Sequence, residues 1–253
     1  MAAVDVIIVN YKSADWLKRS IRSIFKTLNG TDIRIYVEDN SCEKEVEKLG
    51  ELFAQISVTK NTSNLGYAKA LNSSIKKGSA PYVLILNPDT VLLDGFFELV
   101  LRYMDRNPDV GILGPRVLNV DGTVQGSARS FPTPLTAFFG RSSLLTKWFP
   151  HNKLTRRNVL TMASDGVRPM EVDWVSGACM LVRRKAIEEV GLLDEQFFMY
   201  WEDADWCRRM WEKGWKVVYF PTATIIHYTG ASSQQQLCRA VFEFHKSSYL
   251  LFN

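Results

Sequence analysis

A single aspartate, Asp89, follows a short apolar run in the first half of the chain. The run from Val83 to Leu86 is too short for a helix and indicates a buried strand. Asn87-Pro88 ends this strand, because proline donates no backbone hydrogen bond and restricts the residue before it. Asp89 is therefore expected at the carboxyl end of a central strand, where open α/β sheets bind their ligands. Its carboxylate could face a cation or a phosphate-bearing ligand, or it could simply begin a turn.

A second group of acids, Glu202, Asp203 and Asp205, follows the aromatic run from Phe197 to Trp201. Acidic residues favour the first turn of a helix, because they complement the helix dipole, and a helix is predicted to begin near Glu202. That role alone would account for the acids. The aromatic run before them supports a further hypothesis, a dry wall on which a sugar stacks beside a carboxylate.

Strands and helices alternate up to Asp89, which favours a parallel sheet covered by helices on both faces. The expected strands are Val4–Val9, Ile33–Val37, Ile56–Thr59 and Val83–Leu86. Three helices are expected between these strands. The first begins at the N-cap Ser13, the second carries Val46, Leu49 and Phe53 on one face, and the third runs from Ala68 to Gly78.

Polar clusters follow these strands and should meet at one edge of the sheet. They are Asn10-Tyr11, Asp39-Asn40, the stretch from Asn64 to Gly66, and Asp89. Such an edge predicts a nucleotide pocket, in which Asp39 could accept the N3–H of uracil or thymine and Gly66 could let the backbone approach a ligand. The alternative is that Asn, Asp and Gly simply occupy loops. Neither common glycine-rich phosphate loop is present in the sequence.

The second half of the chain has a different pattern. It predicts a helix at Phe96–Met104, a hairpin at Asp121-Gly122, a strand at Val172–Val182 with Gly177 inside it, a helix around Ala186–Val190, and strands at Val217–Phe220 and Ile225–His227. A glycine inside a strand suggests a close approach of backbone or ligand. A lone histidine at a strand end, such as His227, is usually structural.

Basic and aromatic residues alternate between Ser130 and Arg168. The segment from Phe138 to Arg157 could rest on an anionic membrane surface, or it could be a loop that folds over a substrate.

Composition limits the broad class of protein. The chain has 253 residues, 46% of them hydrophobic, which suffices for a sizeable core. A net charge of +4, without a nucleic-acid-binding motif, argues against nucleic acid as a partner. Four scattered cysteines fit reduced thiols, and neither a signal peptide nor a membrane-spanning run is found. We expect a cytoplasmic α/β protein.

Seven motifs occur in order along the chain: IIVNY from Ile7, DNSC from Asp39, NLGYAKALN from Asn64, LNPDT from Leu86, WVSGACMLVRR from Trp174, YWEDADWCRRM from Tyr200 and HYTGAS from His227. In this order they resemble the family-2 glycosyltransferases with the nucleotide-diphosphosugar (GT-A) fold, over almost the whole chain. SFPTP at Ser130–Pro134 makes the chain similar to the bacterial rhamnosyltransferases of surface-polysaccharide assembly.

This resemblance implies one GT-A domain over residues 1–253, with a mostly parallel central sheet flanked by helices and an acceptor-side lobe. Residues 1–109 would bind the nucleotide sugar, and residues 110–253 would bind the acceptor and carry the catalytic residues.

The resemblance also implies roles for single residues. Asp39 would hold the pyrimidine base, Lys69 would contact phosphate, and the nucleotide pocket would include Asn10, Tyr11, Asn64, Gly66, Asn87 and Asp89. Asn87 replaces the first acid of the family's DxD element, so Asp89 alone would give a carboxylate to the metal, with His227 as a second ligand. Asp203, beside Glu202, would be the general base, and Trp174, Gly177 and Trp201 would contact the acceptor.

The implied reaction is inverting sugar transfer assisted by Mg²⁺ or Mn²⁺. The donor would be dTDP-rhamnose or a UDP-sugar, and the acceptor a glycan, polyprenyl-linked if the enzyme works at the inner face of the plasma membrane. A sugar nucleotidyltransferase and a non-catalytic nucleotide-sugar-binding subunit are the alternatives. The first usually begins with a glycine-rich basic loop, which this sequence lacks, and the second should lack Asp89 or Asp203, which are both present.

Overall fold

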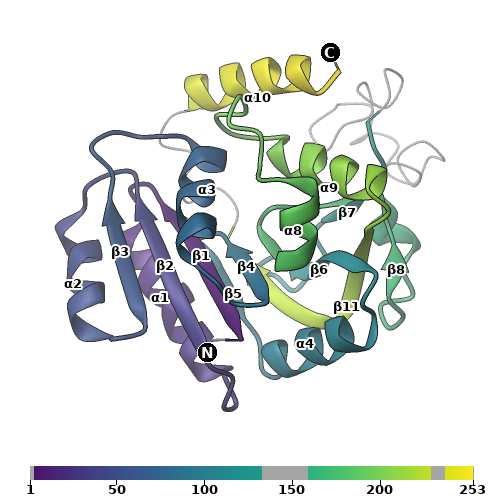
Figure 1. Cartoon of the computed structure of the whole chain (residues 1–253), viewed down its shortest axis with the longest axis horizontal. Coiled ribbons are helices and arrows are strands. Elements are labelled where there is room, and N and C mark those ends of the chain that lie inside the picture. Colours follow the sequence, from purple (N-terminus) through teal and green to yellow (C-terminus); the bar gives the residue numbers. More distant parts are fainter. Residues whose placement is uncertain (1–2, 133–158, 229–236, 253) are drawn as a thin grey trace.

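The computed structural model describes residues 3–132, 159–228 and 237–252, which form a mixed sheet with helices on both faces (Figure 1). The first half contains β1 (Val4–Asn10), α1 (Ala14–Lys26), β2 (Ile33–Asp39), α2 (Lys44–Leu52), β3 (Ile56–Lys60), α3 (Tyr67–Lys77) and β4 (Tyr82–Leu86). It is followed by β5 (Thr90–Leu92), α4 (Phe96–Arg106), β6 (Val110–Leu118), β7 (Ala128–Arg129), the 3₁₀ helix η1 (Leu160–Ala163), β8 (Met170–Glu171), β9 (Trp174–Val175), β10 (Cys179–Arg183), α8 (Arg184–Val190), α9 (Glu202–Glu212), β11 (Lys216–His227) and α10 (Leu237–Phe252).

The main sheet has nine strands, in the order β3-β2-β1-β4-β10-β6-β11-β5 with β8 paired to β11. The first four strands along the chain run parallel, as the alternation of strands and helices predicts. β10 then enters antiparallel to both β4 and β6, so the sheet as a whole is mixed. β4, which precedes Asp89, lies in the middle of the sheet as expected.

Alternate side chains of the central strands enter two cores, one on each face of the sheet. On β1, Val4, Val6 and Ile8 join the core that includes α1, α2 and α4. Ile7 and Val9 join the core that includes α3, α8 and α9. Burial on both faces is typical of parallel strands covered by helices, and it holds the strand ends in fixed positions.

The stretch Val172–Val182 contains two strands instead of the single predicted one. β9 pairs with β7 in a separate two-stranded sheet, whereas β10 lies in the main sheet. The break falls at Gly177, whose backbone N–H donates to the carboxylate of Asp203 on α9. An N–H used in this way cannot also bond to a neighbouring strand, and the chain changes sheets at this point.

Closer to the C-terminus of the chain, the prediction divides one strand into two. The two strands predicted at Val217–Phe220 and Ile225–His227 are a single strand, β11, which has an irregular register between its two parts. The predicted turn at Asp121-Gly122 is confirmed. Gly122 has a φ of 82°, and Asn119 and Thr123 are joined by a backbone hydrogen bond of 2.8 Å across it.

Two helix ends differ in detail from the prediction. Ser13 precedes α1 at the N-cap position, but its hydroxyl donates to Asn10 Oδ1 at 2.9 Å and does not cap the helix. α2 ends at Leu52, so Phe53 lies beyond the predicted helix, where its ring stacks on Phe25 at 5.1 Å. In both cases a contact with another element replaces the local interaction.

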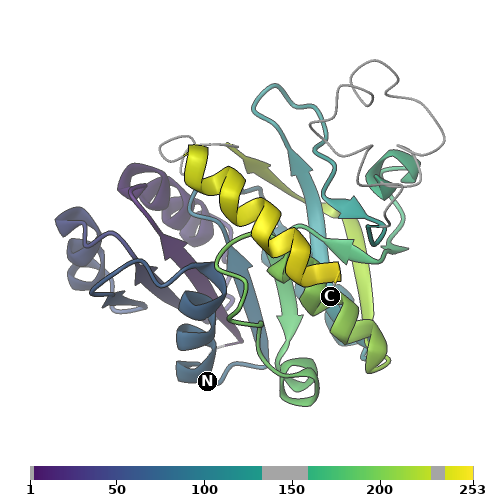
Figure 2. The same cartoon turned by 90° about the horizontal axis from the view of Figure 1, so that it is seen from above.

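The helix α10 is a feature that the sequence analysis did not predict. It lies across the molecule in the view from above (Figure 2). Ser247 Oγ on this helix donates to the backbone oxygen of Met199 at 2.9 Å, and Phe244 packs on Trp201 at 5.5 Å between ring centroids. α10 therefore covers the aromatic run that precedes α9.

Two predictions fall on residues that the structure does not describe. The segment Phe138–Arg157 lies outside the described ranges, as does the end of the HYTGAS motif. Within those ranges, no helix has the length and apolar character needed to cross a bilayer.

Candidate active site

Polar side chains that follow β1, β2 and β3 are joined by hydrogen bonds. Asn10 Nδ2 donates to Asp39 Oδ1 at 3.0 Å. Asn40 Nδ2 lies 3.2 Å both from Asn64 Oδ1 and from the backbone oxygen of Gly66. The structure therefore joins three of the four polar clusters that the sequence placed at one edge of the sheet, the fourth being Asp89. Their role in nucleotide binding remains a prediction.

The Asp39 carboxylate is fully buried and already has protein partners. Its Oδ1 accepts from Asn10, from Ser41 Oγ at 2.8 Å and from the Ser41 N–H at 3.1 Å, and its Oδ2 accepts from the Glu43 N–H at 2.8 Å. These bonds order the turn between β2 and α2. A pyrimidine base could reach Asp39 only by displacing one of these donors, so direct base recognition stays a prediction.

The backbone at Gly66 lies close to Phe198. Its φ of 85° lies in the left-handed region, which favours glycine. A Cβ atom at this position would lie 2.7 Å from both the ring and the backbone oxygen of Phe198. The neighbouring Tyr67 N–H donates to that same oxygen at 2.7 Å. Gly66 thus allows the start of α3 to pack against Phe198, in the segment that leads to Asp203.

We expect Gly66→Ala to lower the free energy of unfolding by about 3 kcal/mol or more, because backbone strain and a steric clash add together. Gly30→Ala is the matched control, since Gly30 has a φ of 83° and nothing lies within 4 Å of its Cβ position. The control should lose only about 1–2 kcal/mol of strain. Urea unfolding measures both changes, and equal losses would contradict the contact with Phe198.

Asp89, in the turn between β4 and β5, and His227, the last residue of β11, form a largely buried pair. His227 Nε2 lies 3.2 Å from Asp89 Oδ1. Gln125 Nε2 donates to the His227 backbone oxygen at 3.0 Å, which turns Gln125 Oε1 toward His227 Nδ1, also at 3.2 Å. An oxygen acceptor at Nδ1 requires a proton there, so in the neutral ring Nε2 presents a lone pair to the carboxylate. Two acceptors facing each other need a proton or a cation between them.

The described residues contain no group of three or more His, Cys, Asp or Glu side chains that could hold a metal ion. The pair of Asp89 and His227 nevertheless offers one oxygen and one nitrogen ligand, a donor set that suits Mn²⁺ and is compatible with Mg²⁺. Further ligands would have to come from a bound diphosphate or from water.

Lys69 and Tyr11 are two other residues assigned to the nucleotide pocket from the sequence. Lys69 is exposed in the first turn of α3, and within the described ranges it makes no hydrogen bond or ion pair with the polar residues above. Tyr11 is half-buried directly after β1. Both assignments remain predictions.

Glu202 and Asp203 begin α9, as the sequence predicts. The two residues before them, Tyr200 and Trp201, have φ values of 71° and 69°, which is uncommon for aromatic residues and marks a sharp turn. After this turn, Asp203 Oδ2 accepts from the Gly177 N–H at 2.8 Å, and Asp203 Oδ1 accepts from the Ala204 N–H at 2.8 Å. The carboxylate is therefore held in one orientation by two backbone donors.

The two acids differ in their hydrogen bonds and hence in their protonation. Burial raises the pKa of Glu202 to about 8, and the nearby Asp203 charge adds to this shift. Burial also raises the pKa of Asp203, but the N–H groups of Gly177 and Ala204 and the charge of Arg129 oppose the change. Glu202 Oε2 is buried without a hydrogen-bond partner among the described residues. Glu202 therefore keeps its proton at neutral pH, whereas the N–H groups of Gly177 and Ala204 favour the ionised form of Asp203.

We expect Glu202→Gln to stabilise the protein near pH 8 by about 1–3 kcal/mol, because glutamine matches the neutral acid without the cost of charging or protonating it. The pKa of Glu202 is about 8 in the fold, against 4.5 normally. Its contribution to stability is therefore fully present below pH 4.5 and is lost as the pH rises to 8. Thermal unfolding at pH 4.5 and pH 8 tests this, with the exposed Glu188→Gln as control. A pH-independent effect of Glu202→Gln would contradict the assignment.

An aromatic wall, defined here as Trp174, Trp201 and Phe244, lies next to these acids. Trp174 and Trp201 are 5.9 Å apart between ring centroids, and Phe244 of α10 also packs on Trp201, at 5.5 Å. Arg129 lies over the Trp174 ring at 5.5 Å. The sequence placed the two tryptophans in the acceptor site but missed Phe244, because α10 itself was not foreseen. Such a wall could stack against a sugar ring beside Asp203.

Tyr67, at the start of α3, was not singled out from the sequence. Its hydroxyl lies 2.9 Å from Asn87 Oδ1 and 3.3 Å from the Gly177 backbone oxygen. Burial, followed by the charges of Glu202, Asp203 and Asp89, raises its pKa well above 10, so the hydroxyl stays protonated. Tyr67 thus connects the Asn87-Pro88-Asp89 turn to the loop that holds Asp203.

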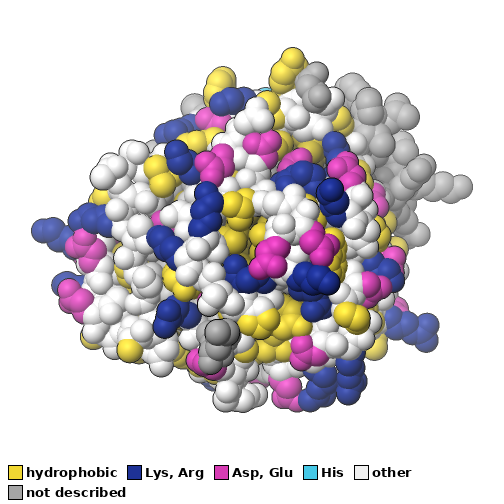
Figure 3. Space-filling model, in the orientation of Figure 1, with side chains coloured by type: hydrophobic (Ala, Val, Ile, Leu, Met, Phe, Trp, Pro, Cys, Tyr) yellow, Lys and Arg dark blue, Asp and Glu magenta, His cyan; other side chains and the backbone are white. Residues whose placement is uncertain are grey.

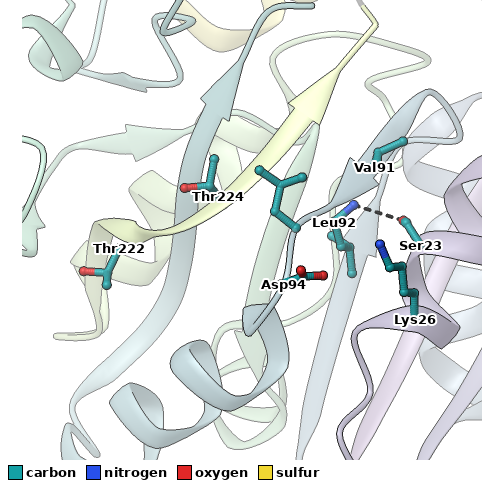
Figure 4. Close-up of a pocket in the computed structure, with 8 residues that line it drawn as sticks. Ser23, Lys26, Val91, Leu92, Asp94, Thr222 and Thr224 are labelled. Carbon is teal, nitrogen blue, oxygen red and sulfur yellow. Dashed lines mark hydrogen bonds between the residues drawn. The ribbon is translucent and has the colours of Figure 1, made fainter. Parts of the chain in front are cut away.

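A separate open pocket of about 500 Å³ lies between α1, β5 and β11 (Figure 4). Ser23 and Lys26 reach it from α1, Asp94 follows β5, and Thr222 and Thr224 come from β11. Ser23 Oγ accepts from the Leu92 N–H at 3.0 Å, which binds the two elements together. The pocket contains none of the residues predicted to take part in catalysis.

Comparison with known families identifies the class of enzyme. Residues 2–241 match the family model described as "Glycosyltransferase like family 2". This chain belongs to that family. It is therefore a glycosyltransferase, and the roles of Asp89, His227, Glu202 and Asp203 in it remain predictions.

Relatives of this family-2 glycosyltransferase include named rhamnosyltransferases. The N-acetylglucosaminyl-diphospho-decaprenol L-rhamnosyltransferase of Mycobacterium tuberculosis is 29% identical over 258 residues, an alignment that covers 98% of this chain and 83% of the relative. The rhamnosyltransferase WbbL of Escherichia coli is 24% identical over 255 residues, which covers 97% of this chain and 90% of WbbL.

Solved structures confirm the GT-A fold of this glycosyltransferase. GalNAc-T7 with UDP, GalNAc and Mn²⁺ matches with a TM-score of 0.67 and 16% identity, over 89% of this chain and 43% of that one. The mannosyltransferase of Pyrobaculum calidifontis in complex with GDP-Man and Mn²⁺ matches with a TM-score of 0.61 and 13% identity, over 90% of this chain and 57% of that one. This chain thus spans about half of each, and the likeness concerns the fold alone.

Proposed function

We propose that this glycosyltransferase transfers a sugar from a nucleotide-diphosphate donor to a glycan acceptor, with inversion at the anomeric carbon. The proposed donor is dTDP-rhamnose, from which rhamnose is transferred, and a UDP-sugar is the alternative. The observation that carries the proposal is the Asp203 carboxylate, fixed by two N–H groups beside the aromatic wall and joined through Gly177 and Tyr67 to the Asn87-Pro88-Asp89 turn.

Asp89 and His227 would hold a divalent ion, because their facing oxygen and nitrogen acceptors leave a place for a cation. A bound ion would neutralise the negative charge that develops on the departing diphosphate. Mn²⁺ is present in both neighbouring structures cited above, which supports the same requirement here. Gln125 would set the His227 ring so that Nε2 faces the ion.

Asp203 would act as the general base. Its raised pKa brings the carboxylate closer to the basicity needed to take a proton at neutral pH, while its two N–H donors keep it ionised. The acceptor hydroxyl would lose its proton to Asp203 as its oxygen attacks the anomeric carbon on the face opposite the diphosphate. One displacement forms the glycosidic bond, breaks the bond to the diphosphate and inverts the centre.

The acceptor is proposed to be a lipid-linked glycan of cell-surface polysaccharide synthesis, with transfer at the cytoplasmic face of the membrane. The support comes from the relative in Mycobacterium tuberculosis, whose name specifies an N-acetylglucosaminyl-diphospho-decaprenol acceptor and L-rhamnose. Trp174, Trp201 and Phe244 would stack on the sugar of the acceptor that lies next to Asp203.

The proposal is tested by incubating the protein with labelled dTDP-rhamnose and UDP-sugars in the presence of a synthetic N-acetylglucosaminyl-diphospho-lipid. Release of nucleoside diphosphate together with a labelled, inverted glycan supports it. Conversion of the donor to sugar 1-phosphate and nucleoside triphosphate on addition of pyrophosphate would instead indicate a nucleotidyltransferase, and donor binding without turnover would indicate a binding subunit.

A further inference from the structure

Large apolar side chains lie on both faces of α10, whereas a helix that packs on a water-soluble protein usually has one polar face. The face that packs on the rest of the molecule combines Phe244, Leu250 and Leu251 with the small or polar Ala240, Glu243 and Ser247. The outward face carries large apolar side chains. Val241 is 50% exposed, Phe242 is 64% exposed and Phe252 is 46% exposed.

The charges on α10 are also divided between its two faces. Arg239, His245 and Lys246 are exposed, whereas Glu243, which is the only acid of the helix, is buried. The outward face therefore combines apolar rings with basic groups and contains no acidic residue. Such a face fits a negatively charged, partly apolar surface.

The position of α10 relates this face to the aromatic wall. Phe244 packs on Trp201, and Arg239 lies over the Phe198 ring at 4.6 Å. In Figure 1, α10 lies along one end of the molecule, above α3 and α9, and Figure 3 shows hydrophobic side chains projecting from that end. A helix of 16 residues is about 24 Å long, enough to lie along a bilayer surface but too short to cross it.

We propose that α10 is a membrane-docking helix, which lies in the interface of an anionic phospholipid bilayer with Phe242 and Phe252 inserted between the lipids. Lys246 would contact the lipid phosphates. Docking in this way would place the aromatic wall beside the membrane, where the sugar of a lipid-linked acceptor emerges. The advantage of docking for catalysis rests on the proposed function, in which the acceptor is lipid-linked. Docking itself requires neither donor nor acceptor.

Vesicle flotation of the purified protein tests docking directly. With vesicles of phosphatidylglycerol and phosphatidylcholine we expect binding that weakens at high salt and falls at least tenfold with phosphatidylcholine alone. The double variant Phe242→Ser with Phe252→Ser should lose at least tenfold in partitioning, and Lys246→Gln should lose less. Leu52→Ser, which removes an apolar side chain that is 71% exposed on α2, is the matched control and should bind like the wild type.

Absence of binding to the anionic vesicles at low salt would overturn the proposal, as would equal binding by wild type and the double variant. Light scattering provides a further test. A wild-type dimer that the double variant abolishes would assign this face to a second copy of the chain and would also overturn docking. The melting temperature and activity with a short water-soluble acceptor should be unchanged in the double variant. Vesicle binding without sugar transfer would refute the proposed reaction but not docking.

Discussion

Replacing Asp203 with asparagine should lower turnover by about 10²–10⁴-fold, because the amide keeps the shape of the side chain but cannot take a proton from the acceptor. Donor affinity should change little, since Asp203 contacts the Gly177 and Ala204 backbone and is assigned to no part of the donor site. Steady-state kinetics together with calorimetric titration of the donor measures both effects.

Glu202→Gln is the matched control for this variant, because Glu202 is already neutral at pH 7 and glutamine is neutral too. It should retain turnover within about tenfold. Wild-type activity should fall as the pH decreases, since protonation removes the base, and the fall should begin above the usual pKa of an aspartate because that of Asp203 is raised. If Glu202→Gln proves as damaging as Asp203→Asn, the base is Glu202, and the assignment of charges within the pair is wrong.

Removal of divalent ions should abolish sugar transfer, and Mn²⁺ or Mg²⁺ should restore it. His227→Ala should raise the metal concentration needed for half-maximal activity by about tenfold or more, because Asp89 would remain as the single side-chain ligand. The measurement is donor turnover in EDTA followed by metal titration. His245→Ala, at an exposed histidine on α10, controls for general loss of imidazole.

A wild-type enzyme with full activity in EDTA would contradict the metal site altogether. An unchanged metal requirement in His227→Ala would instead limit the side-chain ligands to Asp89. Manganese binding measured by electron paramagnetic resonance, without donor turnover, separates a weakened site from a damaged catalytic step.

The first half of the fold could be predicted from local patterns, as could the position of the candidate site residues at strand ends and at a helix start. Buried strands such as Val83–Leu86 and the polar residues after them follow the rule that parallel strands end at one edge of a sheet. Asp89 and Asp203 could be found because proline and an aromatic run mark their surroundings. These signals lie within a few residues of the groups they identify.

The missed features depend on contacts between distant parts of the chain. Tyr67 at a helix start resembles an ordinary packing residue until Asn87 and Gly177 are placed beside its hydroxyl. Gln125 has no local pattern that connects it with His227. α10 was overlooked because its large apolar side chains lie on both faces, so no helical period separates apolar from polar positions.

The antiparallel entry of β10 has a consequence for how the chain folds during synthesis. β4 occupies the middle of the sheet, yet its partner on one side, β10, is synthesised only after β5, α4, β6, β7, η1, β8 and β9. Until Cys179–Arg183 leaves the ribosome, the apolar strand β4 is an unpaired edge, the kind of surface that promotes aggregation. Residues 1–109 therefore depend on a strand supplied by residues 110–253 to complete the sheet beside β4.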